Sequence, residues 1–81
     1  MWLVYIVQCQ DGSLYTGITN NLEKRLKAHN NKRGAKAVRG KLPVKLVYQE
    51  QHDNQPMALK RESEIKGLRR EAKLELIKKG P

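Results

Sequence analysis

The first nine residues constrain the fold more than any other segment of this chain. Met1–Cys9 has the composition of a β-strand, and apolar side chains occupy both of its faces, Trp2 and Val4 on one and Tyr5 and Val7 on the other. Apolar surface left in water costs about 25 cal/mol per Å², so we expect both faces to be covered. With 81 residues in total, the core is small, and we expect one domain over residues 1–81.

A hairpin is predicted directly after this strand. Asp11 and Gly12 form a turn signal, and Leu14–Ile18 is the expected returning strand. A two-residue loop would put Tyr5 and Tyr15 on opposite faces of the hairpin. A three-residue loop ending at a left-handed Gly12 would put both rings on one face. The sequence leaves both loops open, and we favour the three-residue loop.

The rest of the chain predicts three helices and one more strand, which gives the order β-β-α-β-α-α. The signals are capping residues, apolar periodicity, and glycine or proline at the ends. The expected segments are a helix over 21–30 capped by Asn20 and Glu23, a basic loop over 31–42, a strand over Val44–Glu50, a polar turn that includes His52, a helix over Pro56–Lys66, and a helix over Arg69–Lys79 with Ala72, Leu76 and Ile77 facing inward.

Positive charge is concentrated in the middle of the chain. The net charge is +9, and residues 31–48 contain six basic and no acidic residues. Such a block is typical of a surface that binds a polyanion such as nucleic acid. A solvated loop that only keeps the protein soluble is the simpler alternative. The candidate nucleic-acid-binding residues are Lys32, Arg33, Lys36, Arg39 and Lys41.

The sequence indicates neither a membrane-spanning protein nor a disulfide-stabilised one. No apolar segment approaches the roughly 20 residues that span a bilayer. The apolar start, Met1 to Val7, has no basic segment before it and no small-residue cleavage site, so we expect no signal peptide. The single cysteine, Cys9, forms no internal disulfide, and its spacing to His29 and His52 does not resemble a metal site. We expect a reduced, cytoplasmic protein with no membrane partner.

Three polar residues occupy helix positions where apolar ones are expected. At about 100° per residue, Arg25 and His29 fall in the apolar stripe of the first helix, and Glu62 in that of the second. One interpretation is a structural Arg25–Glu62 ion pair beside an inert histidine. The other is a site for phosphodiester hydrolysis, which needs a cation, an acid–base group and a carboxylate for a metal.

Ordered motifs resemble those of the GIY-YIG nuclease superfamily. The first motif reads Leu3-Val4-Tyr5 and the second Tyr15-Thr16-Gly17, on the two strands of the predicted hairpin. A helix with an arginine follows, and then a later helix with a glutamate. The resemblance covers about Met1 to Ile77, and the chain is most similar to the small stand-alone bacterial members of the family. It implies an α+β fold with a three-stranded antiparallel sheet flanked by helices.

The resemblance also implies residue roles. Glu62 would bind one divalent metal ion, Mg²⁺ or Mn²⁺, and Arg25 would bind the scissile phosphate. Tyr5 and Tyr15 would position or deprotonate the attacking water, assisted by His29. A tyrosine acting as a base needs a pKa lowered from about 10.

Gly17 is expected to leave space beside Tyr5, so that a phosphate or water can approach.

The chain departs from the family pattern at several positions. Leu3, Val4 and Thr16 replace residues of the two name-giving motifs, and no asparagine follows Asn54. A Tyr-Thr-Arg run that small relatives often carry is Ala37-Val38-Arg39 here.

Three functions remain open at this level. The first is a metal-dependent DNA endonuclease of low intrinsic sequence specificity, acting on DNA that includes branched or damaged forms, with a protein partner or a second copy supplying specificity. The second is a nucleic-acid-binding module of the same fold that cleaves weakly or not at all. The third is a structural Arg25–Glu62 fold that binds another protein.

Overall fold

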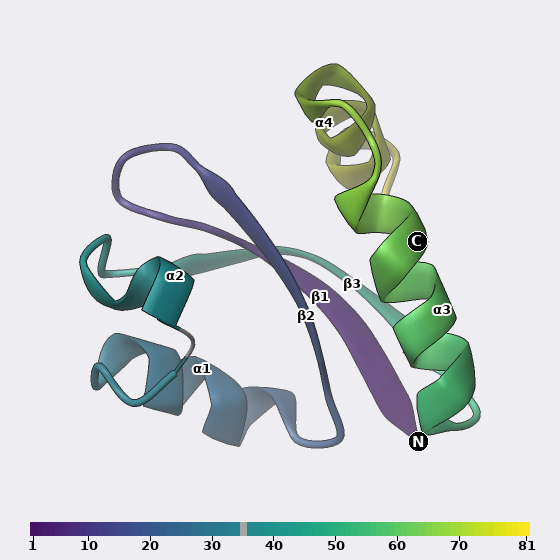
Figure 1. Cartoon of the computed structure of the whole chain (residues 1–81), viewed down its shortest axis with the longest axis horizontal. Coiled ribbons are helices and arrows are strands. Elements are labelled where there is room, and N and C mark those ends of the chain that lie inside the picture. Colours follow the sequence, from purple (N-terminus) through teal and green to yellow (C-terminus); the bar gives the residue numbers. More distant parts are fainter. Residues whose placement is uncertain (35) are drawn as a thin grey trace.

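The apolar first strand is the centre of a three-stranded antiparallel sheet. The computed structural model describes residues 1–34 and 36–81, without the side chain of residue 37. Strands β1 (Trp2–Gln8), β2 (Leu14–Thr19) and β3 (Lys45–His52) lie in the order β2-β1-β3 (Figure 1). Four consecutive residues of β1, Val4 to Val7, have no exposed surface. The strand is therefore covered on both faces, as its composition predicted.

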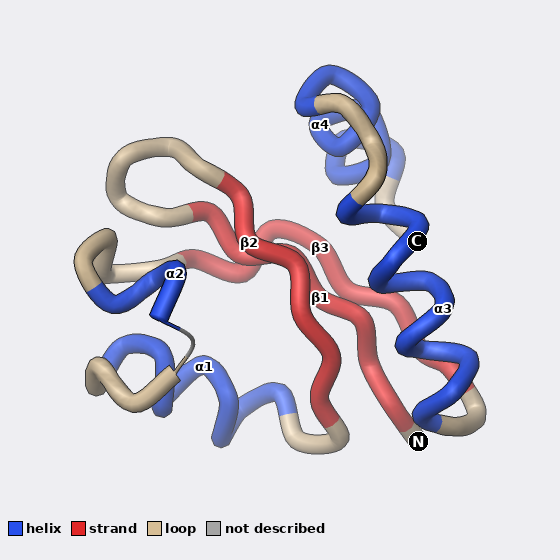
Figure 2. Tube along the Cα trace, in the orientation of Figure 1, coloured by secondary structure: helices blue, strands red, loops and turns tan. Residues whose placement is uncertain are grey.

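Helices cover the two faces of the sheet separately. α1 (Leu22–Asn30) and the short α2 (Lys36–Arg39) lie on one side, and α3 (Gln55–Lys66) and α4 (Arg70–Lys79) on the other (Figures 1 and 2). Tyr5 and Val7 pack with Val38 on the α1 side, whereas Val4 and Ile6 pack with residues of α3 on the opposite side. The expected α+β fold class is confirmed.

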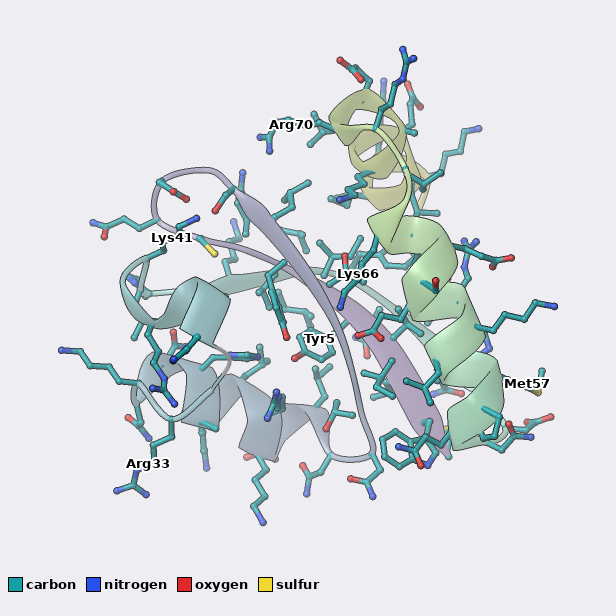
Figure 3. The ribbon with its side chains drawn as sticks, in the orientation of Figure 1. Tyr5, Arg33, Lys41, Met57, Lys66 and Arg70 are labelled. Carbon is teal, nitrogen blue, oxygen red and sulfur yellow. The ribbon has the colours of Figure 1, made fainter. Side chains whose placement is uncertain are left out.

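The hairpin has the three-residue loop. Gly12 adopts the left-handed conformation, with φ 86°, and the Cys9 N–H donates to the Ser13 carbonyl at 2.8 Å. The register pairs Tyr5 with Gly17, which puts Tyr5 and Tyr15 on the same face. Figure 3 shows Tyr5 beside β2 in the middle of the molecule.

Helix α1 begins one residue later than predicted. Its cap is Asn21 and not Asn20, because Thr19 Oγ1 accepts a hydrogen bond from the Asn21 N–H at 3.1 Å. This turn leaves the Asn21 side chain to accept from the Lys24 N–H, also at 3.1 Å. Both Asn20 and Glu23 are exposed.

Two other segments differ from the prediction. The basic loop contains α2, whose single turn is too short to show a helical period; it is fixed by the buried side chain of Val38. In α4, Leu76 and Ile77 pack against the core, but Ala72 is exposed. The helix contacts β3, and its first turn remains exposed at Ala72. None of the helices in the described residues is long and apolar enough to cross a membrane.

Candidate functional site

Three of the predicted site residues meet on the α1 face of the sheet. The Tyr5 hydroxyl lies 2.8 Å from His29 Nε2, and Arg25 Nε donates to the same hydroxyl at 3.3 Å. Arg25 and His29 are one helical turn apart, so α1 presents both toward β1. The strand alternation and the helix period together predicted this meeting.

Tyr15 completes the group from β2. Its ring centre lies 6.5 Å from that of Tyr5 and 5.6 Å from that of His29, where the two rings meet edge to face. We name these four residues, Tyr5, Tyr15, Arg25 and His29, the tyrosine cluster.

Solvent reaches only part of the tyrosine cluster. Tyr5 and His29 have no exposed surface, while Tyr15 and Arg25 are half-buried. His29 Nδ1 has no hydrogen-bond partner among the described residues. A ligand from solution therefore meets Arg25 and Tyr15 first, with Tyr5 and His29 behind them.

Burial controls the protonation of the two inner residues. It raises the pKa of Tyr5 above its ordinary value, although the hydrogen bond and the charge of Arg25 lower it. Burial also lowers the pKa of His29, and the charge of Arg25 adds to this effect. His29 is therefore neutral at pH 7, and Tyr5 holds its proton. The lowered tyrosine pKa that a base needs is absent from Tyr5 in this arrangement.

Gly17 provides space, but Tyr5 itself fills that space. A Cβ atom at Gly17 would lie 2.6 Å from the Tyr5 hydroxyl oxygen and 2.8 Å from its ring carbon Cζ. The glycine therefore lets the phenol ring cross β2, and the predicted opening for phosphate or water at Gly17 is closed by the tyrosine.

Glu62 approaches the tyrosine cluster from the other helical layer. Its side chain is 17% exposed, and its carboxylate lies 3.4 Å from Lys66 Nζ, one turn further along α3. Its negative charge is the smallest of the causes that act on the raised pKa of Tyr5. Figure 3 shows Lys66 reaching from α3 toward the region of Tyr5. Among the described residues, no ion pair joins Arg25 to Glu62.

The donor set around Glu62 fits a weakly held divalent ion. The described residues contain no group of three His, Cys, Asp or Glu that could enclose a metal. Magnesium needs no such enclosure, because it is commonly held by one or two carboxylates together with waters and substrate phosphates. A single half-buried glutamate, Glu62, is consistent with that pattern.

The predicted nucleic-acid-binding residues spread over one side of the molecule. All five are exposed, but two of them already have partners. Arg39 Nε donates to the Gly34 carbonyl at 3.3 Å, and Lys41 Nζ lies 3.6 Å from the Asp11 carboxylate. Figure 3 shows Arg33 and Lys41 well separated along this side. Lys32, Arg33 and Lys36 have no ion-pair partner within the described part of the chain.

A second polar cluster lies on the opposite face and was not predicted. The carboxylate of Glu50 accepts hydrogen bonds from Tyr48 and, at 2.8 Å, from Arg61 Nε, and it lies 2.8 Å from His52 Nε2. We name these four residues the glutamate cluster. His52 belongs to β3, not to the polar turn expected there. The alternation of Tyr48, Glu50 and His52 on one strand face was the available signal.

Comparison with known proteins places this chain in a family. Residues 1–75 match the GIY-YIG catalytic domain, so the chain belongs to the GIY-YIG family. It is 62% identical to a UPF0213 protein of Clostridium perfringens, over 91% of this chain and 80% of the relative. It is 54% identical to a UPF0213 protein of Staphylococcus saprophyticus, over 95% of this chain and 94% of the relative.

A solved structure supports the fold. The solution NMR structure of a UPF0213 protein from Bacillus halodurans is 39% identical, with a TM-score of 0.62, and covers 96% of this chain and 84% of that one. The resemblance found in the sequence is confirmed.

Proposed function

We propose that this protein is a metal-dependent endonuclease that hydrolyses phosphodiester bonds of DNA with low intrinsic sequence specificity. The observation that carries the proposal is the tyrosine cluster, which brings together two tyrosines, an arginine and a neutral histidine. The chain acts as one domain over residues 1–81 in the cytoplasm, and a protein partner or a second copy supplies target choice.

Arg25 binds the scissile phosphate. It is the half-buried cation of the cluster, and the Tyr5 hydroxyl holds its guanidinium in place before substrate arrives. Arg25 also lines a hollow of about 270 Å³ with Asn20, Asn21 and Lys24, which gives a phosphate a route to it. A pre-positioned charge of this kind stabilises the extra negative charge that develops during the reaction.

Tyr5 and Tyr15 position the attacking water, and His29 fixes the direction of the Tyr5 hydroxyl. The Tyr5 oxygen accepts one hydrogen bond from Arg25 and has a second lone pair, which can accept a hydrogen bond from water. Burial keeps His29 neutral, so it assists by hydrogen bonding and does not act as a general base that takes up a proton.

Glu62 is the residue that would hold the divalent ion, Mg²⁺ or Mn²⁺. Such an ion supplies positive charge at the phosphate and lowers the pKa of nearby hydroxyl groups. To hold the ion, the Glu62 carboxylate would give up its ion pair with Lys66, which would cost little because Lys66 is half-exposed.

DNA is bound mainly through its phosphates. Lys32, Arg33, Lys36, Arg39 and Lys41 are exposed on the α1–α2 side, where contacts to the backbone carry no sequence information. A chain of this size has few further groups for reading bases, which is why we propose low specificity and include branched and damaged DNA among its substrates.

Nicking of supercoiled plasmid with Mg²⁺ or Mn²⁺ tests the proposal. We expect Glu62→Gln and Arg25→Ala to lose activity by about 10²-fold or more. Exposed residues on the same helices, Glu64→Gln and Lys27→Ala, serve as matched controls and retain it. Parallel assays on linear, branched and single-stranded DNA define the preferred form.

Two other results would replace the proposal. Salt-sensitive DNA binding without cleavage, unchanged in Glu62→Gln, identifies a nucleic-acid-binding module. Loss of folding in Glu62→Gln, with no DNA affinity in the parent protein, identifies a structural role for this residue.

A further inference from the structure

Gly34 is packed against the one edge of His29 that has no hydrogen bond. A Cβ atom at Gly34 would lie 2.1 Å from His29 Nδ1 and 2.8 Å from two ring carbons. Real Cβ atoms do not approach so closely, so any side chain here must displace the imidazole or the backbone. Gly34 is itself buried, and its φ lies outside the left-handed region that would require glycine. The glycine is therefore needed for space and not for backbone conformation.

The imidazole is confined from two opposite edges. His29 Nε2 already lies at hydrogen-bond distance, 2.8 Å, from the Tyr5 hydroxyl. Nδ1, on the other side of the ring, faces Gly34. A ring pushed away from Gly34 cannot move closer to Tyr5, so it must tilt and give up the hydrogen bond. The Tyr15 ring packs edge to face against the imidazole, and the two ring centres are 5.6 Å apart.

The backbone around Gly34 is fastened to α1 and α2. The Lys32 N–H donates to the His29 carbonyl at 3.1 Å, and the Arg33 N–H donates to the Ala28 carbonyl at 2.8 Å. Arg39 Nε donates to the Gly34 carbonyl at 3.3 Å. Because these bonds hold Gly34 from both sides, the backbone at this position resists moving out of the way of a new side chain.

We propose that Gly34 is a positioning residue that holds the His29 imidazole in its hydrogen bond with Tyr5. It acts only through His29 and touches neither DNA nor the reacting atoms. The inference rests on the proposed nuclease function for its effect on activity, but the packing it describes is independent of that function.

The test compares Gly34→Ala with Gly40→Ala. Gly40 lies in the same basic segment, and nothing stands within 4 Å of the position of its Cβ, so it is a matched control. We expect Gly34→Ala to lower plasmid nicking by about 10²-fold, which is typical of a small misplacement near a reacting centre. Gly40→Ala keeps the parent's rate.

Imidazole NMR separates positioning from a general structural defect. In the parent and in Gly40→Ala, His29 titrates below its ordinary pKa, because it is buried beside Arg25. In Gly34→Ala, the displaced ring is expected to titrate closer to pH 6.5. The groups that face it are Tyr5, Tyr15 and Arg25, and none of them is altered by this substitution. An unchanged His29 titration in Gly34→Ala overturns the inference.

A double substitution keeps the inference testable even where Gly34→Ala fails to fold. His29→Ala removes the ring that the new methyl group would strike, so Gly34→Ala is expected to add no further loss of activity or stability in that background. If Gly34→Ala lowers activity or stability as much in the His29→Ala background as in the parent, the inference is contradicted. If the parent cleaves no DNA, the proposed function fails, but the titration and unfolding measurements still decide the role of Gly34.

Discussion

The tyrosine cluster and the glutamate cluster lie on opposite faces of one small sheet and use almost the same residue types. Each contains tyrosine, histidine and arginine, but only the second has a carboxylate at its centre. Glu50 accepts from or contacts all three of its neighbours, and its side chain is only 13% exposed. In the tyrosine cluster the Tyr5 hydroxyl takes the central place, and His29 Nδ1 has no partner among the described residues.

The missing carboxylate leaves the tyrosine cluster incomplete. A buried polar group without a partner costs free energy, and the second cluster shows that this fold can satisfy such groups fully. Arg25 has no ion-pair partner among the described residues and lies next to a neutral tyrosine and histidine, so it can accept an anion from solution, whereas Glu50 already pairs with the arginine of the glutamate cluster. Under the proposed function, binding and chemistry belong to the first cluster, and we expect the second to contribute stability.

Substitution of the two tyrosines gives the largest expected contrast. Tyr5→Phe removes the hydroxyl that contacts both Arg25 and His29, so we expect nicking to fall by about 10²–10⁴-fold. Tyr48→Phe removes a hydroxyl bonded to Glu50 and is expected to keep the parent's rate. Initial rates of plasmid nicking at matched protein concentration measure both. Equal losses in the two variants would show that the clusters are not separate in function.

Removal of the central carboxylate has the largest expected effect on stability. Glu50→Gln leaves a half-buried Arg61 and the Tyr48 hydroxyl with a weaker acceptor. We expect the free energy of unfolding to fall by about 1–3 kcal/mol, measured by urea denaturation. Tyr5→Phe is the control and is expected to cost less, because its partners are already incompletely bonded. A larger cost for Tyr5→Phe would reverse the assignment of the two clusters.

The smallest expected effects concern the pH dependence of stability, which also distinguishes the two clusters. Burial lowers the pKa of His29, and Arg25 adds to this. The unfolded imidazole therefore binds a proton before the folded one as the pH falls. Stability conferred by the neutral ring is complete above about pH 6.5 and is lost as the pH falls from there toward the folded pKa.

A second loss is expected at lower pH. Burial by itself raises the pKa of Glu50, but the hydrogen bonds from Tyr48, His52 and Arg61 outweigh it and the pKa is lowered. The unfolded carboxylate is protonated first, so this contribution is complete above about pH 4.5 and is lost as the pH falls toward the folded pKa. Urea denaturation at a series of pH values measures both losses. Glu50→Gln should abolish only the loss of stability at the lower pH, and His29→Phe only the loss at the higher pH.

The tyrosine cluster could be predicted because local patterns define it. Strand alternation places Tyr5, and the helix period places Arg25 and His29 on one face of α1. The remaining uncertainty was the length of the hairpin loop, since the Asp11-Gly12 pair fits two loops and only Gly12 in its observed conformation selects one. Sequence periodicity is enough to fix which face of its strand or helix each of these residues occupies.

Other contacts depend on how the layers pack, and local patterns do not show this. Glu50 and Arg61 come from β3 and α3, and their pairing needs the distance between these elements. Gly34 lies in a basic stretch with no apolar period, so its contact with His29 has no signature in the sequence. The cap of α1 was displaced by one residue because a threonine hydroxyl, Thr19 Oγ1, holds the turn.

The position of β1 also determines when the parts of the site come together during synthesis. The chain emerges with β1, β2 and α1 first, and these carry all four residues of the tyrosine cluster within the first 30 positions. The other edge of β1 stays open until β3 emerges, and Glu62 follows only on α3. In a nascent chain the four residues of the tyrosine cluster therefore emerge before Glu62, so under the proposed function the residues that would bind phosphate precede the one that would bind the metal.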